Sequence, residues 1–389
     1  MKSDVPPMAV LLAYIADWQT FAMVPRLLRR AGFIPVAFGP SGSLVARSRY
    51  TERAIGTGKA AIDVLAQLKD HLTNEGKDRY TRVIFCEDPI LRAIHRSHGS
   101  EWLPWLPVRS WSTFDIIMSK ALLISAGEKA GLCVPRTRLC GEAEALRQTA
   151  LDFGFPLFVK PDVGTGGQFA FRIDHAGELE KRLSDGLPRY PVIAQEFISG
   201  NVGCTSVVFA NGRPLSMLHS FKYRSHPGPY GPSTARVFCD CPGAETLVRG
   251  IGALTGFDGL AGIDWIADHQ TGEIKLLEMN PRPVSCVHLG RYGGQDSAMA
   301  IRDWLEGRHH EQRMQVKIRT PVLLFPKDVI RCLHLDLREL RHWVSPFVCR
   351  DIPWADPPVL AQLTRQMTGE GVRALTNKVR GTLAGWRKG

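Results

Sequence analysis

The stretch Glu278-Met279-Asn280-Pro281-Arg282-Pro283 follows a mainly apolar run at residues 274–277, and this pattern predicts a β-strand that ends in polar side chains. Successive side chains of a strand point to opposite faces, so Glu278, Asn280 and Arg282 are expected on one face. Carboxylate and amide oxygens suit a hard cation such as Mg²⁺, and a nearby guanidinium suits phosphate. The stretch therefore predicts a metal and phosphate site, with an ordinary polar strand face as the alternative.

A second carboxylate, Asp264, lies upstream in a strand-like segment at residues 262–266. Residues 268–272, between the two segments, predict a turn. A hairpin centred on Thr271 places Asp264 directly opposite Glu278, because both lie seven residues from it. Facing carboxylates repel each other unless a cation lies between them, so the hairpin favours a divalent cation at this position.

Length and composition indicate a soluble globular protein. A chain of 389 residues can form two or three domains, and 44% hydrophobic with 22% charged residues is an ordinary composition. The nine cysteines include no CxxC pair, which favours a reducing compartment and argues against a zinc site or a disulfide framework. The first apolar run, at residues 8–16, is too short for a membrane span and predicts a buried strand. We therefore expect a cytoplasmic protein.

Positive charge is concentrated near the C-terminus. Residues 308–389 hold 15 Lys or Arg and 7 Asp or Glu, which is most of the formal net charge of +11. Strand-like residues 322–325 and two basic helical segments, at 329–340 and 360–386, are expected there. Such a segment suits an acidic partner or an anionic membrane surface, and a solvated surface is the plainer alternative. We expect no nucleic acid partner.

The N-terminal residues alternate between strands and helices. Strands are expected at residues 9–14, 35–38 and 83–86, with an amphipathic helix at 21–30, and this order indicates an open α/β layer. The turn after the first strand has no glycine fingerprint, so this layer is not predicted to bind a dinucleotide.

Two lysines and a glycine-rich turn follow. Lys120 lies in a helix expected at residues 112–131, and Lys160 ends a strand expected at 155–161. The tip of the next hairpin is Gly164-Thr165-Gly166-Gly167, whose backbone N–H groups can approach an anion closely. A lysine at the neighbouring strand end adds a point charge for phosphate oxygens. A flexible turn and solvated lysines are the alternatives.

Residues 221–236 are dense in Gly, Pro, Tyr, Arg and Ser, which predicts a long and largely irregular loop. Arg224, Ser233 and Arg236 are its candidates for contact with an anionic substrate. Residues 284–295 are the second segment expected to select the substrate. Neither segment contains a motif that identifies the substrate.

Together these residues resemble the ATP-grasp superfamily over about residues 8–310. The resemblance implies that Lys120 and Lys160 bind the nucleotide, that the loop of Gly164, Thr165, Gly166 and Gly167 covers the phosphates, and that the hinge of Gln195, Glu196, Phe197 and Ile198 receives adenine. It also implies that Asp264, Glu278 and Asn280 hold the metal and that Arg282 lies near the transferred phosphate, with Lys160 and Arg282 as catalytic residues. No acidic residue follows the hinge at residues 201–204, so the ribose contact is unassigned.

The fold implied is α/β: an N-terminal open α/β lobe at residues 1–110, an ATP-grasp domain at 111–310 with a small α/β lid at about 150–200, and a basic, partly helical C-terminal extension at 311–389. The activity implied uses ATP and Mg²⁺ (or Mn²⁺) to phosphorylate a carboxylate, which an amine or thiol then attacks with release of ADP and phosphate. Small-molecule or peptide acids and amines are the expected partners, and a homo-oligomer is compatible with the sequence. A biotin-carboxylase or carbamoyl-phosphate type of enzyme and a non-catalytic nucleotide-binding regulator are the alternatives.

Overall fold

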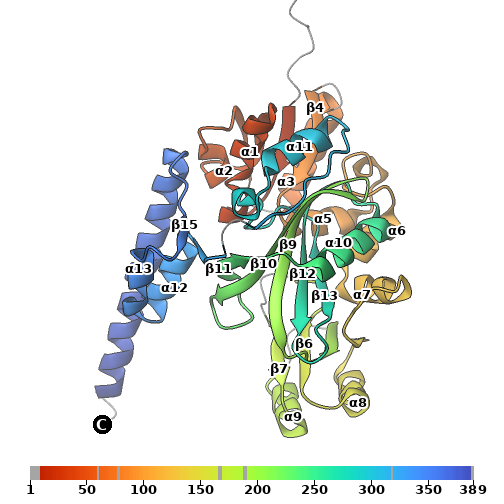
Figure 1. Cartoon of the computed structure of the whole chain (residues 1–389), viewed down its shortest axis with the longest axis vertical. Helices are drawn as coiled ribbons and strands as arrows, with labels where there is room; N and C mark the ends of the chain where they lie inside the picture. Colours follow the sequence, from red (N-terminus) through yellow and green to blue (C-terminus); the bar gives the residue numbers. More distant parts are fainter. Residues whose placement is uncertain are drawn as a thin grey trace, which may run out of the picture.

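The computed structural model describes residues 9–58, 61–76, 79–164, 169–186, 191–316 and 319–386. Three β-sheets with helices packed beside them make up this part of the chain (Figure 1). The mixture of strands and helices confirms the α/β class predicted from the sequence.

The first sheet is parallel and has the strand order β3-β2-β1-β4. Every residue of β1 is buried, as expected for an apolar strand that is covered on both faces. The strands are β1 (Ala9–Ala13), β2 (Ile34–Pro40), β3 (Arg53–Thr57) and β4 (Tyr80–Phe85). The helices are α1 (Val24–Ala31), α2 (Leu44–Arg47), α3 (Ala61–His71) and α5 (Asp88–Ser97), with short turns η1 (Gln19–Phe21), η2 (Leu72–Gly76) and η3 (Ser100–Trp102).

The single helix expected at residues 112–131 is wrong, because the structure has two helices, α6 (Trp111–Met118) and α7 (Lys120–Lys129). Ser119 separates them in an extended conformation and caps α7, its hydroxyl accepting from the N–H of Leu122 at 3.2 Å. The same hydroxyl donates to the carboxylate of Asp162 at 2.9 Å. The break makes Lys120 the first residue of α7 and places it beside residue 162.

The second sheet is small and antiparallel, with the order β5-β8-β6-β7. It has a core of its own, formed by Cys140, Leu146, Leu157, Val159 and their neighbours. Its strands are β5 (Thr137–Cys140), β6 (Leu157–Pro161), β7 (Phe171–Ile173) and β8 (Val192–Glu196), and its helices are α8 (Ala143–Phe153) and α9 (Ala176–Ser184).

The third sheet has seven strands in the order β13-β12-β9-β10-β11-β14-β15. Apolar residues of α10, α11 and this sheet share two cores with the first sheet, so the two lobes are joined by buried packing. The elements are β9 (Gly200–Ala210), β10 (Arg213–Ser225), β11 (Ser233–Phe238), α10 (Pro242–Thr255), β12 (Gly259–Asp268), β13 (Ile274–Asn280), η4 (Gly290–Gly293), α11 (Ser297–Leu305), β14 (Val322–Leu324) and β15 (Cys349–Asp351).

The long loop expected at residues 221–236 is wrong for most of its length. Strands β10 and β11 pair through it, with Lys222 opposite Arg236, and only residues 226–232 lie outside the strands. The glycines and prolines are concentrated in those seven residues, whereas the charged residues beside them lie on strands. Polar side chains in this segment are therefore held by a sheet.

The C-terminal extension adds the last two strands of the third sheet and three helical elements, α12 (Lys327–His334), η5 (Leu337–Trp343) and α13 (Pro357–Trp386). Asp356, just before α13, accepts from the Ser48 hydroxyl at 2.5 Å and from the N–H of Arg49 at 3.1 Å. Val359 and Leu363 pack against Ala22 and Leu44 of the first lobe. The extension thus contacts both the N-terminal lobe and the third sheet (Figure 1).

No helix in the described ranges is long and apolar enough to cross a bilayer. The contact of the basic extension with an acidic partner or a membrane surface stays a prediction.

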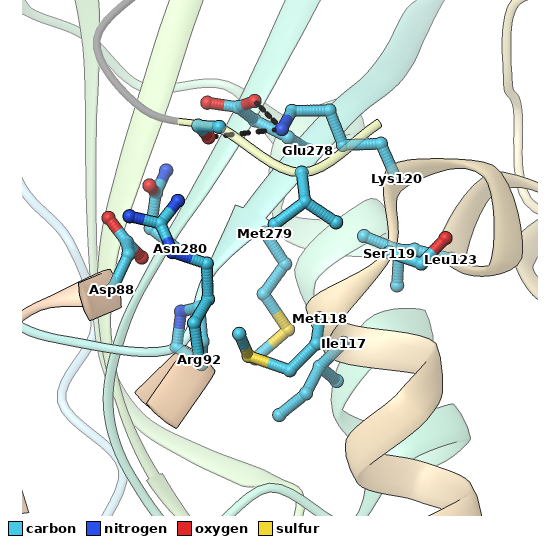
Figure 2. A pocket seen from close by; sticks show the side chains of 13 residues that line it. Asp88, Arg92, Ile117, Met118, Ser119, Lys120, Leu123, Glu278, Met279 and Asn280 are labelled. Atoms are coloured by element: carbon cyan, nitrogen blue, oxygen red, sulfur yellow. Dashed lines mark hydrogen bonds and ion pairs between the residues drawn. The ribbon is translucent and has the colours of Figure 1, made fainter. Parts of the chain in front are cut away.

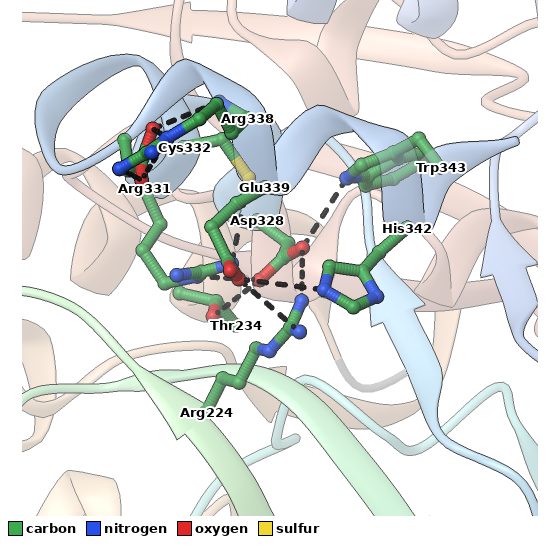
Figure 3. Close-up of polar contacts among 10 residues, drawn as sticks. Arg224, Thr234, Asp328, Arg331, Cys332, Arg338, Glu339, His342 and Trp343 are labelled. Atoms are coloured by element: carbon green, nitrogen blue, oxygen red, sulfur yellow. Dashed lines mark hydrogen bonds and ion pairs between the residues drawn. The ribbon is translucent and has the colours of Figure 1, made fainter. Parts of the chain in front are cut away.

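Asp328 is the residue that attaches α12 to the third sheet. Its carboxylate is fully buried and accepts from the Thr234 hydroxyl at 2.9 Å and from Arg331 Nε at 2.8 Å. Arg224 Nη1 lies 3.5 Å from the other carboxylate oxygen, which also accepts from the indole of Trp343 at 3.2 Å (Figure 3). Asp328 therefore pairs with two arginines, from β10 and α12, and both also pair with the less buried Glu339.

We predict that Asp328→Ala lowers the free energy of unfolding by about 2–3 kcal/mol, because the change removes the buried anion that Arg224 and Arg331 share and leaves them only the less buried Glu339. Urea-induced unfolding followed by far-UV circular dichroism measures this effect. The matched control is Asp152→Ala, which breaks a half-exposed pair with Arg138 and should change stability by at most about 1 kcal/mol. Equal losses for the two variants would contradict the role given to Asp328.

Candidate active site

Asp264 and Glu278 face each other across β12 and β13, in the register expected from the sequence. The Asn280 amide donates to Asp264 Oδ2 at 3.2 Å, so all three predicted metal residues lie together. Burial raises the pKa of Asp264 above its usual value, and the charge of Glu278 adds to the rise. Burial also acts to raise the pKa of Glu278, but the charges of Lys120 and Lys160 outweigh it and bring that pKa below its ordinary value.

This group fits a hard divalent cation. Two facing carboxylates and an amide supply the oxygen donors that Mg²⁺ prefers. The raised pKa of Asp264 shows that the pair is in electrostatic conflict, which a bound cation would relieve. Metal binding by Asp264, Glu278 and Asn280 nevertheless stays a prediction.

Lys120 lies over the Glu278 carboxylate, with Nζ 3.7 Å from Oε2 (Figure 2). The same ammonium donates to the carbonyls of Asp162 and Gly164, each at 3.1 Å. Lys120 thus lies between the metal residues and the start of the glycine-rich turn. Thr165, Gly166 and Gly167 lie outside the described residues.

Lys160 approaches the same carboxylate from the small sheet. Its side chain is buried, and Nζ donates to the carbonyl of Leu277 on β13 at 3.3 Å. Burial lowers the pKa of Lys160 to about 8; the charge of Glu278 opposes this shift and that of Lys120 adds to it. Two lysines from different elements therefore converge on Glu278.

The predicted hinge connects β8 of the small sheet to β9 of the large one. Gln195 is buried and donates to the Thr137 hydroxyl at 2.7 Å, and Glu196 pairs with Arg136 at 3.2 Å. The N–H of Phe197 donates to the carbonyl of Pro156 at 3.2 Å. The segment is firmly held where the two sheets meet, and adenine contact by Gln195, Glu196, Phe197 and Ile198 stays a prediction.

Arg282 connects the metal residues to the N-terminal lobe. Its Nε donates to Asp88 Oδ2 at 2.8 Å, and its Nη2 donates to Asn280 Oδ1 at 3.2 Å. The guanidinium carbon also lies 5.3 Å from the centre of the Trp18 ring. The sequence analysis did not identify Asp88 or Trp18 as site residues. The position of Asp88, shortly after a strand predicted to be buried, was a feature that could have indicated it.

The cleft between these elements is lined by residues of α5, α6, α7 and β13 (Figure 2). Arg92 of α5 extends toward Asn280 in this view and was also missed from the sequence. On the other side, Lys222 donates to the carbonyl of Gly231 at 3.0 Å. Burial lowers the pKa of Lys222, and the charge of Asp264 opposes this shift, so Lys222 lies within electrostatic range of the metal residues.

The three predicted substrate residues do not form one group. Arg224 pairs with Asp328 and with Glu339, the latter at 3.3 Å, and thus faces the C-terminal extension. The hydroxyl of Ser233 is buried without a hydrogen-bond partner. Arg236 is buried, donates to the Ser220 hydroxyl at 3.1 Å, and has a buried Nε without a partner. Its charge acts to lower the pKa of Asp264, so of these three Arg236 is the one associated with the metal residues.

Part of the chain matches a known family of domains. Residues 117–286 match the family model of the ATP-grasp domain, so this part of the chain is an ATP-grasp domain. The resemblance found in the sequence is thereby confirmed.

Two curated relatives show how far the similarity extends. The chain is 26% identical over 255 residues to D-alanine–D-alanine ligase of Laribacter hongkongensis, covering 61% of this chain and 79% of that protein. It is 22% identical over 185 residues to the arginine-specific carbamoyl phosphate synthase large chain of Bacillus subtilis, which is 44% of this chain. The chain thus spans only 17% of that synthase chain.

Among solved structures, the chain resembles the biotin carboxylase domain of Hydrogenobacter thermophilus 2-oxoglutarate carboxylase, crystallised with MgADP, ADP and bicarbonate. The TM-score is 0.61 at 15% identity, with 79% of this chain and 71% of that one covered. This likeness confirms the fold.

The pKa of Lys160 leads to a prediction for the free protein. Below pH 8 the folded state holds a charged, buried lysine, whereas between pH 8 and 10.5 the folded state releases this proton and the unfolded state keeps it. The free energy of unfolding of the wild type should therefore rise over this range, by up to about 3 kcal/mol, relative to that of Lys160→Met.

Urea unfolding of both proteins at several pH values between 7 and 10.5 measures this difference. Lys129→Met, which removes an exposed lysine of α7, is the control and should follow the wild type at every pH. A difference between wild type and Lys160→Met that stays constant from pH 7 to 10.5 would contradict the assignment.

Proposed function

We propose that the chain is an ADP-forming ligase that uses ATP to phosphorylate a carboxylate and joins the resulting acyl phosphate to an amine or a thiol. The observation that carries this proposal is the convergence of Lys120 and Lys160 on Glu278, which lies opposite Asp264. Carbon–nitrogen bond formation is the outcome we favour, and the D-alanine–D-alanine ligase among the relatives supports it.

The residues present suit phosphoryl transfer, in which catalysis rests on positioning and on charge stabilisation. The two lysines would hold phosphate oxygens of ATP on the side of the small sheet, and Arg282, oriented by Asp88, would bind the transferred phosphate from the side of the N-terminal lobe. A Mg²⁺ ion held by Asp264, Glu278 and Asn280 would neutralise phosphate charge. No nucleophilic side chain is required.

The proposed reaction has two steps. A carboxylate oxygen of the acid attacks the terminal phosphorus of ATP, the bond to the bridging oxygen breaks, and ADP leaves. The amine nitrogen then attacks the acyl carbon, inorganic phosphate leaves with the bonding electrons, and the amine releases its proton to solvent.

Carbamoyl phosphate formation is the second candidate, because six of the relatives shown by sequence comparison are carbamoyl phosphate synthase large chains. Those matches cover at most 18% of each synthase chain. Dependence of ADP formation on bicarbonate, in place of an organic acid, would distinguish this candidate.

Hydroxylamine provides a direct test, because it intercepts an acyl phosphate as a hydroxamate whatever the natural amine is. With Mg-ATP, a pool of organic acids and hydroxylamine, we expect hydroxamate, ADP and phosphate in equal amounts. Release of AMP and pyrophosphate would contradict the proposed mechanism.

We predict that Glu278→Gln lowers hydroxamate formation by about 10²–10³-fold, because a charge that orients the two lysines and the metal is lost. The melting temperature should stay close to that of the wild type, since the substitution also relieves repulsion from Asp264. Glu180→Gln, which alters a surface pair with Arg147, is the matched control and should keep full activity. If Glu278→Gln retains activity, the carboxylate pair is only a polar sheet face.

A further inference from the structure

A second group of cations lies where the C-terminal extension joins the third sheet. Arg236 on β11 is directly opposite Val322 of β14, and α12 begins with Lys327 a few residues beyond β14. The extension lies outside residues 117–286, which match the ATP-grasp domain. Any ligand contact made by Lys327 therefore comes from the C-terminal extension and not from the ATP-grasp domain.

Lys327 is held beside Arg236 by its neighbour in sequence. Asp328 binds the Thr234 hydroxyl, and Thr234 lies two residues from Arg236, on the same face of β11. The buried Asp328 cluster of Figure 3 thus fixes the start of α12 over that face. Arg224 contributes to the arrangement by pairing with Asp328.

Among the described residues, the two cations of this group have no carboxylate in an ion pair with them. In the described part of the chain, no carboxylate forms an ion pair with Arg236, and Lys327 makes neither an ion pair nor a hydrogen bond. Burial lowers the pKa of Lys327 to about 8, and the positive charges of Arg236 and Arg282 add to this shift while Asp351 opposes it. Arg282, by contrast, already pairs with Asp88.

His288 and Cys286 lie in the same region. His288 Nε2 pairs with Asp351 at 2.9 Å, while its buried Nδ1 has no partner. A hydrogen bond from Cys204 lowers the pKa of the Cys286 thiol, and the positive charges of Arg236 and His288 lower it further. A thiol of lowered pKa, two cations and an imidazole therefore share one region, and Asp351 and an ionised Cys286 balance its positive charge only in part.

Arg236 is buried and Lys327 is partly buried, and buried charge without a partner is costly, so an anion from outside the chain would stabilise this group. We propose that Arg236, Lys327 and His288 bind a second anionic group, a carboxylate or a phosphate, on the acid whose reacting carboxylate lies beside Arg282. The inference rests on the proposed ligase function, and it names the substrate class as acids with at least two negative charges. The C-terminal extension thereby completes the substrate site.

The test is a binding experiment on the full chain saturated with Mg²⁺ and a non-hydrolysable ATP analogue, so that phosphate probes do not enter the nucleotide site. Isothermal titration compares succinate and 3-phosphoglycerate, which carry two anionic groups, with propionate, which carries one. We expect both dianions to bind at least about tenfold more tightly than propionate. The dianion that binds more tightly shows whether the second anionic group is a carboxylate or a phosphate.

Lys327→Met should weaken binding of the preferred dianion by about 10- to 100-fold, the effect of losing a hydrogen bond to a charged group, without changing propionate binding. Lys327→Arg should restore most of the affinity, and Lys181→Met, an exposed lysine of α9, should behave as the wild type. Because the Lys327 side chain has no ion-pair or hydrogen-bond partner among the described residues, Lys327→Met should fold, and Arg236→Gln provides a second variant with the same expected loss. Titration with a fluorescent ATP analogue should give wild-type nucleotide affinity for Lys327→Met.

Equal affinity of the wild type for succinate, 3-phosphoglycerate and propionate would overturn the inference, as would unchanged dianion binding in Lys327→Met. The ligase proposal can fail separately. If dianion binding depends on Lys327 but the protein never forms ADP, the anion site is supported and the reaction is contradicted. If the protein forms ADP with acids that bind to Lys327→Met and to the wild type with equal affinity, the reaction is supported and the anion site is contradicted.

Discussion

The electrostatic conflict between Asp264 and Glu278 is the constraint on which the site depends. Antiparallel pairing of β12 and β13 places the two carboxylates side by side, and the protein does not remove the repulsion by separating them. Positive charge is brought to them from other elements: Lys120 from the start of α7, Lys160 from β6 and Arg282 from beyond β13. Each is held by contacts to a different part of the chain, so cations from three parts of the chain meet at the carboxylate pair.

The contacts that hold those cations come from different lobes of the protein. Lys160 ties the small sheet to β13 through the Leu277 carbonyl, and Asp88 of the N-terminal lobe orients Arg282. The C-terminal extension is attached through Asp328 and places Lys327 beside Arg236. A nucleotide would thus meet cations from the small sheet and α7, and an acid would meet cations from β11 and the extension.

The sequence predicted what depends on local pattern. Strand alternation and a turn centred on Thr271 placed Asp264 opposite Glu278, and the apolar run before Lys160 located that lysine at a strand end. It did not reveal the break at Ser119, because the partner of that hydroxyl, Asp162, lies 43 residues away. The strands at residues 221–236 were missed for the same reason: Thr234 is satisfied by Asp328, 94 residues later. Asp88 and Arg282 are separated by 194 residues, and no local signal connects them.

The most direct test of the central claim is the affinity of the protein–ADP complex for Mn²⁺, measured by electron paramagnetic resonance titration of free Mn²⁺. The wild type should bind the ion tightly in the presence of ADP, and Asp264→Asn and Glu278→Gln should each weaken it by at least about tenfold. Exposed Asp152→Asn should have no effect. Mn²⁺ affinity that is unchanged when Asp264 and Glu278 are replaced together would contradict the account, because the facing carboxylates would then hold no metal.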